Sequence, residues 1–580
     1  MQTSFIRIAV LVFICVKYGF AGDAITIDGL FEDWTEIPVA YADAAGDGSE
    51  DFADFKITND KDFLFIKIAF HSSKQLLQDL NSIKLFIDTD NNNQTGHQTN
   101  GIGAELEWCF GCRDGIYYSS TGEAAIRQAD IIIRSAPTIT SKEFEIAIGL
   151  NSIPMTSGTL VTPDNLSLFL SSSDNTDFVP DASGGFSYVV DTNNVEPLNI
   201  IPLVKNIEQH VRMMTYNTLS SGLFDTDRQD HFKKIIQALN PDIMGFQEQS
   251  DGNQVKALIS NWIQETELYS VELGNGNVVV SKYPVLNQAL LTTSDRTMAV
   301  LLQTESILGQ NLLIINSHLA CCANNESRQN DADEIIKIMR NWRSGDGPFP
   351  LALNTPIVHL GDFNLVGDSQ QLITLTEGDI VNEATFGEDF LPDWDNTGLA
   401  DLFSRQTSIR MGYTWRNDNS SFSPGKLDYI LYSDSNIELG NHFVLNTLAM
   451  SQSELDTYGL LSENTNIASD HLPRIMDIAS LSPVSIEDKT EIPNKIELYP
   501  AYPNPFNSTT NIRYSLSKTG RVSLTVYDLL GKQVEVLVNE IQSAGPYVIQ
   551  FDAGTLSSGI YLYHLESIGQ SKVKKLLLVK

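Results

Sequence analysis

The chain has 580 residues, of which 42% are hydrophobic and 19% charged. This composition is typical of a globular protein and excludes a wholly disordered, collagen-like or polytopic membrane protein. The 38 basic and 73 acidic residues give a formal charge of −35, which argues against a protein that coats duplex nucleic acid. At roughly 150 residues per domain, the length predicts about three to four domains.

The amino terminus has the pattern of a secretory signal peptide. Arg7 precedes an apolar stretch over 8–16, and small residues follow at Gly19 and Ala21. We therefore expect a signal peptide over 1–22 and an exported chain. The alternative is a membrane anchor, but about nine continuous apolar residues are too few to cross a bilayer. We expect no stable transmembrane segment in the mature chain.

Four cysteines remain after removal of the signal peptide, and they form two close pairs. These are Cys109 with Cys112 and Cys321 with Cys322. An oxidising compartment would permit a disulfide in each pair. The CxxC pair could also be redox-active or half of a zinc site, but no second CxxC exists, so we expect a local disulfide.

The first module, residues 24–200, is rich in short alternating segments separated by Asn, Asp and Gly turns. We expect two strands within 51–70, with a turn at 59–62, and further strands at 82–90 and 165–172. Such spacing favours a β-sandwich. The stretch 191–206 is a candidate boundary with the next domain.

Two motifs of this module resemble those of the family-nine type of carbohydrate-binding module, which is also DOMON-like. They are IDGLFEDWTEIP at 27–38 and FIDTDNNNQTG at 86–96. The resemblance implies a glycan as ligand, held by aromatic side chains, and a calcium ion. Trp34 and Trp108 are the candidates for stacking on sugar, although tryptophan is more often buried scaffolding.

A candidate calcium site lies in the second of these motifs. Asp88, Asp90 and Asn92 alternate along a loop, and oxygen ligands at that spacing can converge on Ca²⁺. The alternative is an ordinary Asx-rich turn, because the full EF-hand pattern is missing.

The central segment, residues 205–480, alternates apolar strands with amphipathic helices. Phe232, Ile235, Ile236 and Leu239 have helical spacing, and Pro241 ends that helix. A second helix is expected over 327–342. The expected strands are at 210–217, 242–246, 277–284, 311–319, 356–364 and 426–433.

Polar residues repeatedly follow these strands, so we expect them to gather at one rim of a packed sheet. Carboxylate and amide oxygens suit Mg²⁺ or Mn²⁺, and two histidines supply proton transfer and charge stabilisation. Together they fit the attack of water on a phosphate ester. The residues are Asn217, Glu248, His318, Asp362, Asn364, Asp470 and His471.

The motifs that carry these residues occur in the order found in the endonuclease/exonuclease/phosphatase superfamily, which the segment resembles over about 270 residues. They are TYN, QE, SKYP, NSHL, GDFN, LDYI and SDHLP. Any one motif is weak, whereas the ordered set is specific. The resemblance implies a four-layer α/β sandwich in which two mixed sheets are packed face to face and flanked by helices.

The resemblance also implies the metal-binding side of the site. Glu248 matches the family's metal-binding glutamate, with Asn217 and Asp470 beside it. Asp362 in GDFN matches the aspartate that orients the attacking water or a metal.

The remaining roles concern the phosphate. Asn364 matches the amide that holds a phosphate oxygen, and His471 matches the imidazole that faces the phosphate. Asp428 matches the carboxylate that orients this imidazole. His318 matches the second histidine of deoxyribonuclease-like members, which stabilises the pentacoordinate phosphorus or protonates the leaving oxygen.

The sequence departs from the family around this second histidine. The GNGN stretch at 274–277 lacks the substrate-contacting tyrosine and the supporting carboxylate of several nucleases. Arg296 and Arg328 are candidate phosphate contacts, with surface salt bridges as the alternative. The stretch 318–328 resembles secreted members with a Cys-rich loop, in which a Cys321–Cys322 bridge would be an unusual tight ring.

The C-terminal segment, residues 495–580, follows a polar linker at 481–494 and is expected to form a small β-sandwich. YPNPF, VYDLLGK and SSGIYLYHL, together with a basic, apolar end, resemble the sorting domain of the type IX secretion system. The resemblance implies a partnership with that machinery and a secreted or cell-surface protein. The alternative is an ordinary adhesion domain.

These features predict a secreted, divalent-metal-dependent phosphoesterase, most simply an extracellular nuclease acting on DNA or RNA. The first alternative is a sphingomyelinase-like enzyme or another small-molecule phosphodiesterase or phosphatase of the same superfamily. The second is a non-catalytic glycan-binding protein of the cell surface. The intact set of acids, amides and histidines argues against the second alternative.

Overall fold

The computed structural model describes residues 25–481 except 47, 49, 72–73, 157–164 and 192–197, and residues 496–579 except 500, 502, 503, 505, 517, 530, 543–544, 555 and 568–569. The predicted signal peptide and all but the first residue of the predicted linker lie outside the described residues. The chain divides into two compact units, Met1–Ser482 and Pro483–Lys580. Among the described residues, no helix has the length and apolar character needed to cross a membrane.

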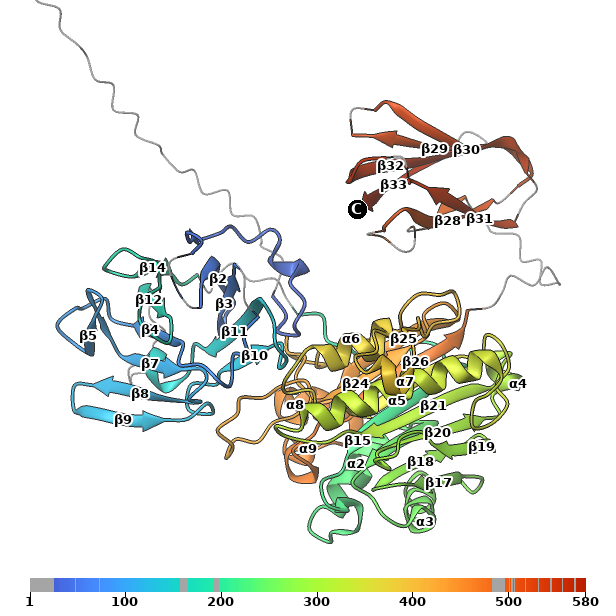
Figure 1. Cartoon of the computed structure of the whole chain (residues 1–580), viewed down its shortest axis with the longest axis horizontal. Helices are drawn as coiled ribbons and strands as arrows, with labels where there is room; N and C mark the ends of the chain where they lie inside the picture. Colours follow the sequence, from blue (N-terminus) through green and yellow to red (C-terminus); the bar gives the residue numbers. More distant parts are fainter. Residues whose placement is uncertain are drawn as a thin grey trace, which may run out of the picture. The chain divides into compact units, whose positions relative to one another are not determined.

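Two antiparallel sheets form the N-terminal module (Figure 1). One sheet has the order β1-β2-β3-β11-β10, and the other β13-β12-β4-β7-β8-β9, with β14 paired to β12. The elements are η1 (Glu32–Trp34), β1 (Tyr41–Ala42), β2 (Phe52–Asn59), β3 (Phe63–Phe70), β4 (Lys84–Asp88), β5 (His97–Thr99), β6 (Ile102–Ala104), β7 (Leu106–Cys109), β8 (Asp114–Ser119), β9 (Gly122–Ile126), β10 (Arg134–Ala136), β11 (Glu143–Gly149), α1 (Ile153–Thr156), β12 (Asn165–Ser171), β13 (Phe178–Val179) and β14 (Phe186–Val189).

Residues of both sheets share one hydrophobic core. The predicted strands at 51–59 and 63–70 are present as β2 and β3, and 82–90 and 165–172 contain β4 and β12. Their alternating side chains place one apolar face inside. The predicted local disulfide between Cys109 and Cys112 is also present.

The prediction that Trp34 and Trp108 stack on sugar is wrong for this fold. Trp34 is 1% exposed and Trp108 is 3% exposed, so neither ring presents a face to a ligand. The Trp34 indole donates to Glu145 Oε2 over 3.0 Å, which satisfies its polar atom inside the core.

The central domain contains two mixed six-stranded sheets. Their orders are β17-β18-β16-β15-β26-β25 and β19-β20-β21-β22-β24-β23. The strands are β15 (Val211–Asn217), β16 (Ile243–Gln247), β17 (Tyr269–Leu273), β18 (Asn277–Ser281), β19 (Val285–Leu290), β20 (Thr297–Leu302), β21 (Leu312–His318), β22 (Ile357–Asp362), β23 (Ala400–Asp401), β24 (Asp428–Tyr432), β25 (Ile437–Val444) and β26 (Arg474–Ser480).

The helices of this domain cover the outer faces of the paired sheets, with α2 and α3 on one side and α5 and α6 on the other (Figure 1). They are η2 (Gly222–Phe224), α2 (Gln229–Leu239), α3 (Gly252–Ile263), α4 (Glu305–Leu308), α5 (Asn325–Ser344), α6 (Gln370–Glu377), α7 (Glu383–Phe386), η3 (Thr447–Ala449), α8 (Gln452–Tyr458) and α9 (Asn464–Ala468).

Alternate residues of one strand serve different cores, which sets the order of the layers. Met213 packs between the two sheets, whereas Met214 packs outward against α2 and α3. Period-two alternation of this kind requires both faces of a strand to be covered. The resulting order is helix, sheet, sheet, helix.

Helix α2 illustrates how the sequence sets an element. The four predicted apolar residues, Phe232, Ile235, Ile236 and Leu239, are all buried. The helix ends at Asn240, which has φ of 42°, because Pro241 cannot continue it. The next strand, β16, begins two residues later and leads directly to Glu248.

The C-terminal unit has its own core and two antiparallel sheets, β27-β28-β31 and β30-β29-β32-β33. The strands are β27 (Glu497–Leu498), β28 (Thr509–Leu516), β29 (Gly520–Asp528), β30 (Gln533–Gln542), β31 (Gly545–Asp552), β32 (Gly559–Ser567) and β33 (Gln570–Leu578).

Candidate phosphoesterase site

The site lies where two pairs of parallel strands end. Strand β15 is parallel to β16, and β21 is parallel to β22. The carboxyl ends of each pair therefore meet at one edge of its sheet. Asn217, His318 and Asp362 are the last residues of β15, β21 and β22, and Glu248 follows β16.

Asn217 joins the two sheets at this edge. Its Nδ2 donates to Glu248 Oε1 over 3.0 Å and to Asp362 Oδ2 over 2.9 Å. Its Oδ1 accepts the N–H of Leu219. The amide is fully buried, so it holds two carboxylates of different sheets in a fixed relation.

Glu248 has a strained backbone and a stabilised negative charge. Its φ is 59°, a conformation that a glutamate rarely adopts. Its Oε2 accepts the N–H of Ser220 over 2.7 Å. Burial favours the neutral acid, but the hydrogen bonds from Asn217 and Ser220 and the nearby histidines together hold the pKa of Glu248 below its ordinary value.

Asp362 lies at the centre of the cluster. Its Oδ1 accepts the N–H of Asn364 over 3.0 Å, and its Oδ2 accepts from Asn364 Nδ2 over 3.1 Å. The Nε2 atoms of His318 and His471 each lie 3.7 Å from Asp362 Oδ2, and His318 Nε2 is 3.9 Å from Glu248 Oε1. Burial raises the pKa of Asp362.

Asp428 and His471 form a buried dyad. Asp428 Oδ2 lies 2.9 Å from His471 Nδ1, which fixes the ring with Nε2 directed at Asp362. Burial lowers the pKa of His471, but the charges of Asp428 and Asp362 outweigh it and raise the pKa to about 10. The two carboxylates therefore favour the protonated form of this imidazole.

Asp470, the third predicted metal ligand, has a different environment from Glu248. Its Oδ2 accepts from the Trp415 indole over 3.0 Å, and its Oδ1 is buried with no hydrogen-bond partner among the described residues. Among the hydrogen bonds of the described residues, none joins its carboxylate to Asn217 or Glu248. Its charge contributes to the raised pKa of His471, and its role as a metal ligand stays a prediction.

The two candidate phosphate contacts have different positions. Arg296 is half-buried beside the site, with Nη1 3.3 Å from the carbonyl of His318. Arg328 is 0% exposed and donates to the carbonyls of Ala320 and Cys322. Its prediction as a phosphate contact is wrong, because its guanidinium holds the loop that leads into α5.

That loop carries Cys321 and Cys322, which are exposed free thiols. The disulfide that an oxidising compartment would permit here is not formed, and the Cys322 thiol donates to Cys321 Sγ over 2.8 Å. Cys322 has a φ of 65°, and the loop keeps this shape because Arg328 hydrogen-bonds its carbonyls.

Sequence reasoning missed several residues that shape the site. The Thr414 hydroxyl accepts the N–H of Asp428 over 2.9 Å. The Ser469 hydroxyl donates to the carbonyl of Asn217 and accepts the N–H of His471. Ser469 could have been predicted from the sequence, because it belongs to the SDHLP motif. Thr414 and Trp415 lie in a segment without strand periodicity, so no sequence pattern indicated them.

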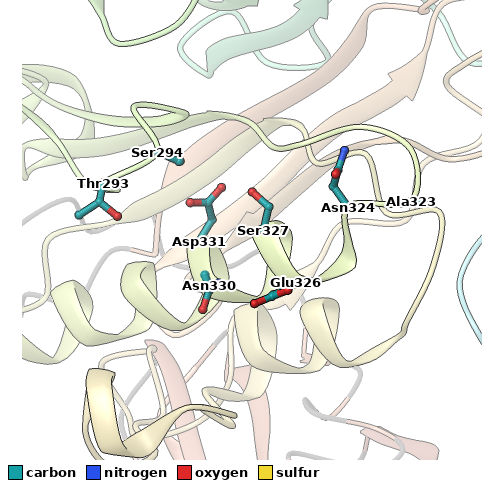
Figure 2. Close-up of a pocket in the computed structure, with 8 residues that line it drawn as sticks. All are labelled: Thr293, Ser294, Ala323, Asn324, Glu326, Ser327, Asn330 and Asp331. Atoms are coloured by element: carbon teal, nitrogen blue, oxygen red, sulfur yellow. The ribbon is translucent and has the colours of Figure 1, made fainter.

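A polar pocket of about 510 Å³ lies between the 293–294 loop and the start of α5. Figure 2 shows Asp331 and Ser327 pointing from α5 toward the loop that carries Ser294. Burial raises the pKa of Asp331 to about 6. The lining residues are Thr293, Ser294, Ala323, Asn324, Glu326, Ser327, Asn330 and Asp331.

The candidate calcium loop brings together a different set from the predicted one. Asp88, Asp90 and Glu105 offer oxygen atoms within 4.8 Å of one another. Asn92 Oδ1 instead accepts the N–H of Gln94 within its own turn. Burial raises the pKa of Glu105 to about 7. Calcium binding at this loop stays a prediction.

Comparison with known families agrees with this geometry. Residues 214–471 match the model of the endonuclease/exonuclease/phosphatase family. The central domain belongs to the endonuclease/exonuclease/phosphatase family. Residues 500–580 match the secretion system C-terminal sorting domain, so the C-terminal unit is a type IX sorting domain. No curated protein matches the chain.

Three solved structures are similar to the chain. The human Nocturnin catalytic domain with bound sulfate is 17% identical, with a TM-score of 0.31 over 48% of this chain and 99% of that one. Sphingomyelinase C from Streptomyces griseocarneus is 14% identical, with a TM-score of 0.27 over 46% of this chain and 99% of that one. An AP endonuclease from Archaeoglobus fulgidus is 12% identical, with a TM-score of 0.28 over 46% of this chain and 98% of that one.

Family membership makes the central domain a hydrolase of phosphate esters. The type IX sorting domain directs the chain to the cell surface or the medium. An enzyme of the endonuclease/exonuclease/phosphatase family thus occupies the middle of an exported chain.

Proposed function

We propose that the protein is a secreted, divalent-metal-dependent phosphodiesterase that acts as a nuclease on extracellular DNA or RNA. The observation that carries the proposal is the continuous cluster at the strand ends. Asn217 bonds both Glu248 and Asp362, and Asp362 lies 3.7 Å from the imidazoles of both His318 and His471. Acids, amides and histidines are thus collected around one point.

The donor chemistry of this cluster fits Mg²⁺ or Mn²⁺. Glu248 is the anionic ligand, with the side chains of Asn217 and Asp362 next to it, and hard oxygen donors suit these ions. Asp362, Asp428 and His471 also offer atoms within 4.8 Å of one another, but Asp428 is committed to the His471 ring. When bound, the cation would polarise a phosphoryl oxygen.

The chain's own groups then act on the phosphodiester. The His471 imidazolium, held by Asp428, faces the negative phosphate and offsets charge as it builds in the transition state. The amide of Asn364 donates to Asp362 Oδ2 and to the carbonyl of Leu319, and it would exchange one of these bonds to hold a phosphate oxygen. Asp362 orients the attacking water, and His318 Nε2 is placed to protonate the leaving oxygen.

The pocket between the 293–294 loop and α5 has a polar lining, and none of its lining residues belongs to the cluster at the strand ends. Seven of its eight lining residues carry hydroxyl, amide or carboxylate groups. Such a lining matches the hydroxyl and amino groups of a nucleotide, whereas acyl chains would leave these polar groups without partners.

A substrate panel tests the proposal. Full-length protein is assayed with Mg²⁺ on plasmid DNA, RNA, sphingomyelin and a generic phosphodiester, each with and without chelator. We expect chelator-sensitive cleavage of nucleic acid, and none by the His471→Ala variant. Preferential release of phosphocholine would establish the lipid alternative. Turnover that chelator leaves unchanged would refute the metal requirement.

A further inference from the structure

The N-terminal module shares hydrophobic cores with the catalytic domain. Ile139 of the module is buried among catalytic-domain residues that include Phe363, Leu365 and Tyr429. A second shared core joins module residues to the segment around 411–413 and to the residue after His471. Its buried members are Ile25, Ile27, Trp34, Ile37, Phe65, Ala136, Ala147, Met411, Tyr413, Val444 and Leu472.

The module also pairs its backbone with a loop of the catalytic domain. The N–H of Ile27 donates to the carbonyl of Arg410 over 3.0 Å, and the N–H of Gly412 donates to the carbonyl of Ile27 over 2.7 Å. Two residues later, Thr414 accepts the N–H of Asp428. The module therefore supports the loop that holds the start of β24.

One side chain of the module, that of Thr138, contacts the segments next to the ends of β22 and β24. The Thr138 hydroxyl lies 2.8 Å from the carbonyl of Leu365 and 3.2 Å from that of Lys426. Leu365 follows Asn364, and Tyr429 follows Asp428. Thr138 thus contacts both the segment after β22, which carries Asn364, and the segment that leads into β24, which begins at Asp428.

The fit around Thr138 is tight. A Cβ added at Gly425 would lie 2.4 Å from Thr138 Cγ2, so the loop backbone passes directly over this side chain. Close packing leaves little room for a second arrangement of these groups.

We propose that Thr138 is a positioning residue, and that the N-terminal module is a structural part of the active site rather than an appended binding domain. The catalytic consequence rests on the proposed phosphodiesterase function. Strands β22 and β24 are paired through their backbones, with Asp362 opposite Asp428. Thr138 holds the segments that continue from them, at Leu365 and Lys426, and so fixes the position of Asn364 relative to the Asp428–His471 dyad.

Loss of the hydroxyl is expected to act on turnover. Without it, the carbonyls of Leu365 and Lys426 lose their shared partner, and the segments after β22 and before β24 are held less tightly against each other. Misplacement of reacting groups by about 1 Å can reduce rates by about 100-fold. A partial relaxation is expected to reduce kcat by about tenfold, with KM changed by less than about twofold because substrate contacts remain.

The experiment compares three variants of the full-length protein. Thr138→Val removes the hydroxyl, and Thr138→Ser retains it. Thr140→Val is the matched control, because its hydroxyl contacts Asp368 and Ser369 at the same interface but further along the chain from Asn364. We measure kcat, KM and amide hydrogen exchange over 362–367 and 425–429.

We expect Thr138→Val alone to lower kcat and to accelerate exchange in both segments, with Thr138→Ser restoring each. Equal behaviour of Thr138→Val and Thr140→Val in both measurements would overturn the proposal. Hydrogen exchange needs no substrate. A wild-type protein inactive on every phosphate ester would therefore refute the proposed function, while the exchange comparison would still decide the role of Thr138.

Discussion

The Asp428–His471 dyad predicts a specific dependence of stability on pH, which Asp428→Asn should remove. The pKa of His471 rises from 6.5 to about 10 in the folded protein. A displacement of this size corresponds to roughly 5 kcal/mol of stability. Because the folded pKa is the higher one, this contribution is complete below pH 6.5 and is lost as the pH rises to about 10.

In Asp428→Asn, the neutral amide has nearly the same shape as the carboxylate, but one of the two main negative charges near the His471 imidazole is lost. Loss of an adjacent opposite charge lowers such a pKa by about 2, which brings that of His471 to about 8. Each bound proton changes the unfolding free energy by about 1.4 kcal/mol per pH unit. Between pH 8 and pH 10, the wild type should therefore lose about 2 kcal/mol more than the variant.

Urea unfolding of the chelator-treated full chain at several pH values measures this difference. The matched control is Asp331→Asn, a buried aspartate whose own pKa is about 6 and which therefore titrates below the window. We expect its slope between pH 8 and 10 to follow the wild type. Parallel curves for wild type and Asp428→Asn would refute the assignment of the His471 charge to this carboxylate.

The remaining predictions concern the metal, the buried arginine and the disulfide. Glu248→Gln should raise the Mg²⁺ concentration for half-maximal activity by at least about tenfold; an unchanged Mg²⁺ titration would remove Glu248 from the ligands. Arg328→Met should lower the unfolding free energy by about 3 kcal/mol, because buried carbonyls lose a charged donor, with KM unchanged; a raised KM alone would restore a substrate role. Replacement of Cys109 and Cys112 by serine should cost about 2 kcal/mol in urea unfolding, with turnover unaffected; no change in stability would contradict this.

Much of the catalytic site was predictable because its residues follow a local rule. Each of Asn217, His318 and Asp362 ends an apolar run, and such runs form buried strands. Parallel neighbours then bring strand ends together without further information. The helix over 229–239 was equally predictable, since its four apolar residues have one spacing and a proline follows.

The residues that were wrongly predicted or missed depend on contacts between distant segments. The sequence around Arg328 does not show that its guanidinium donates to the carbonyls of residues 320 and 322. The sequence around Trp34 likewise does not show that Glu145, 111 residues away, accepts its indole N–H. Thr138 and Thr414 act through backbone groups of other elements. Hydrogen bonds of this kind are common for threonine, so only the folded structure shows which backbone groups these two hydroxyls contact.

The two neighbours of the catalytic domain differ in how their interiors are built. The C-terminal unit has a core made of its own residues. The N-terminal module contributes Ile27 and Ile139 to cores shared with the catalytic domain. Recombination could therefore exchange the C-terminal unit as a separate domain. The N-terminal module and the catalytic domain share cores, so they must evolve together.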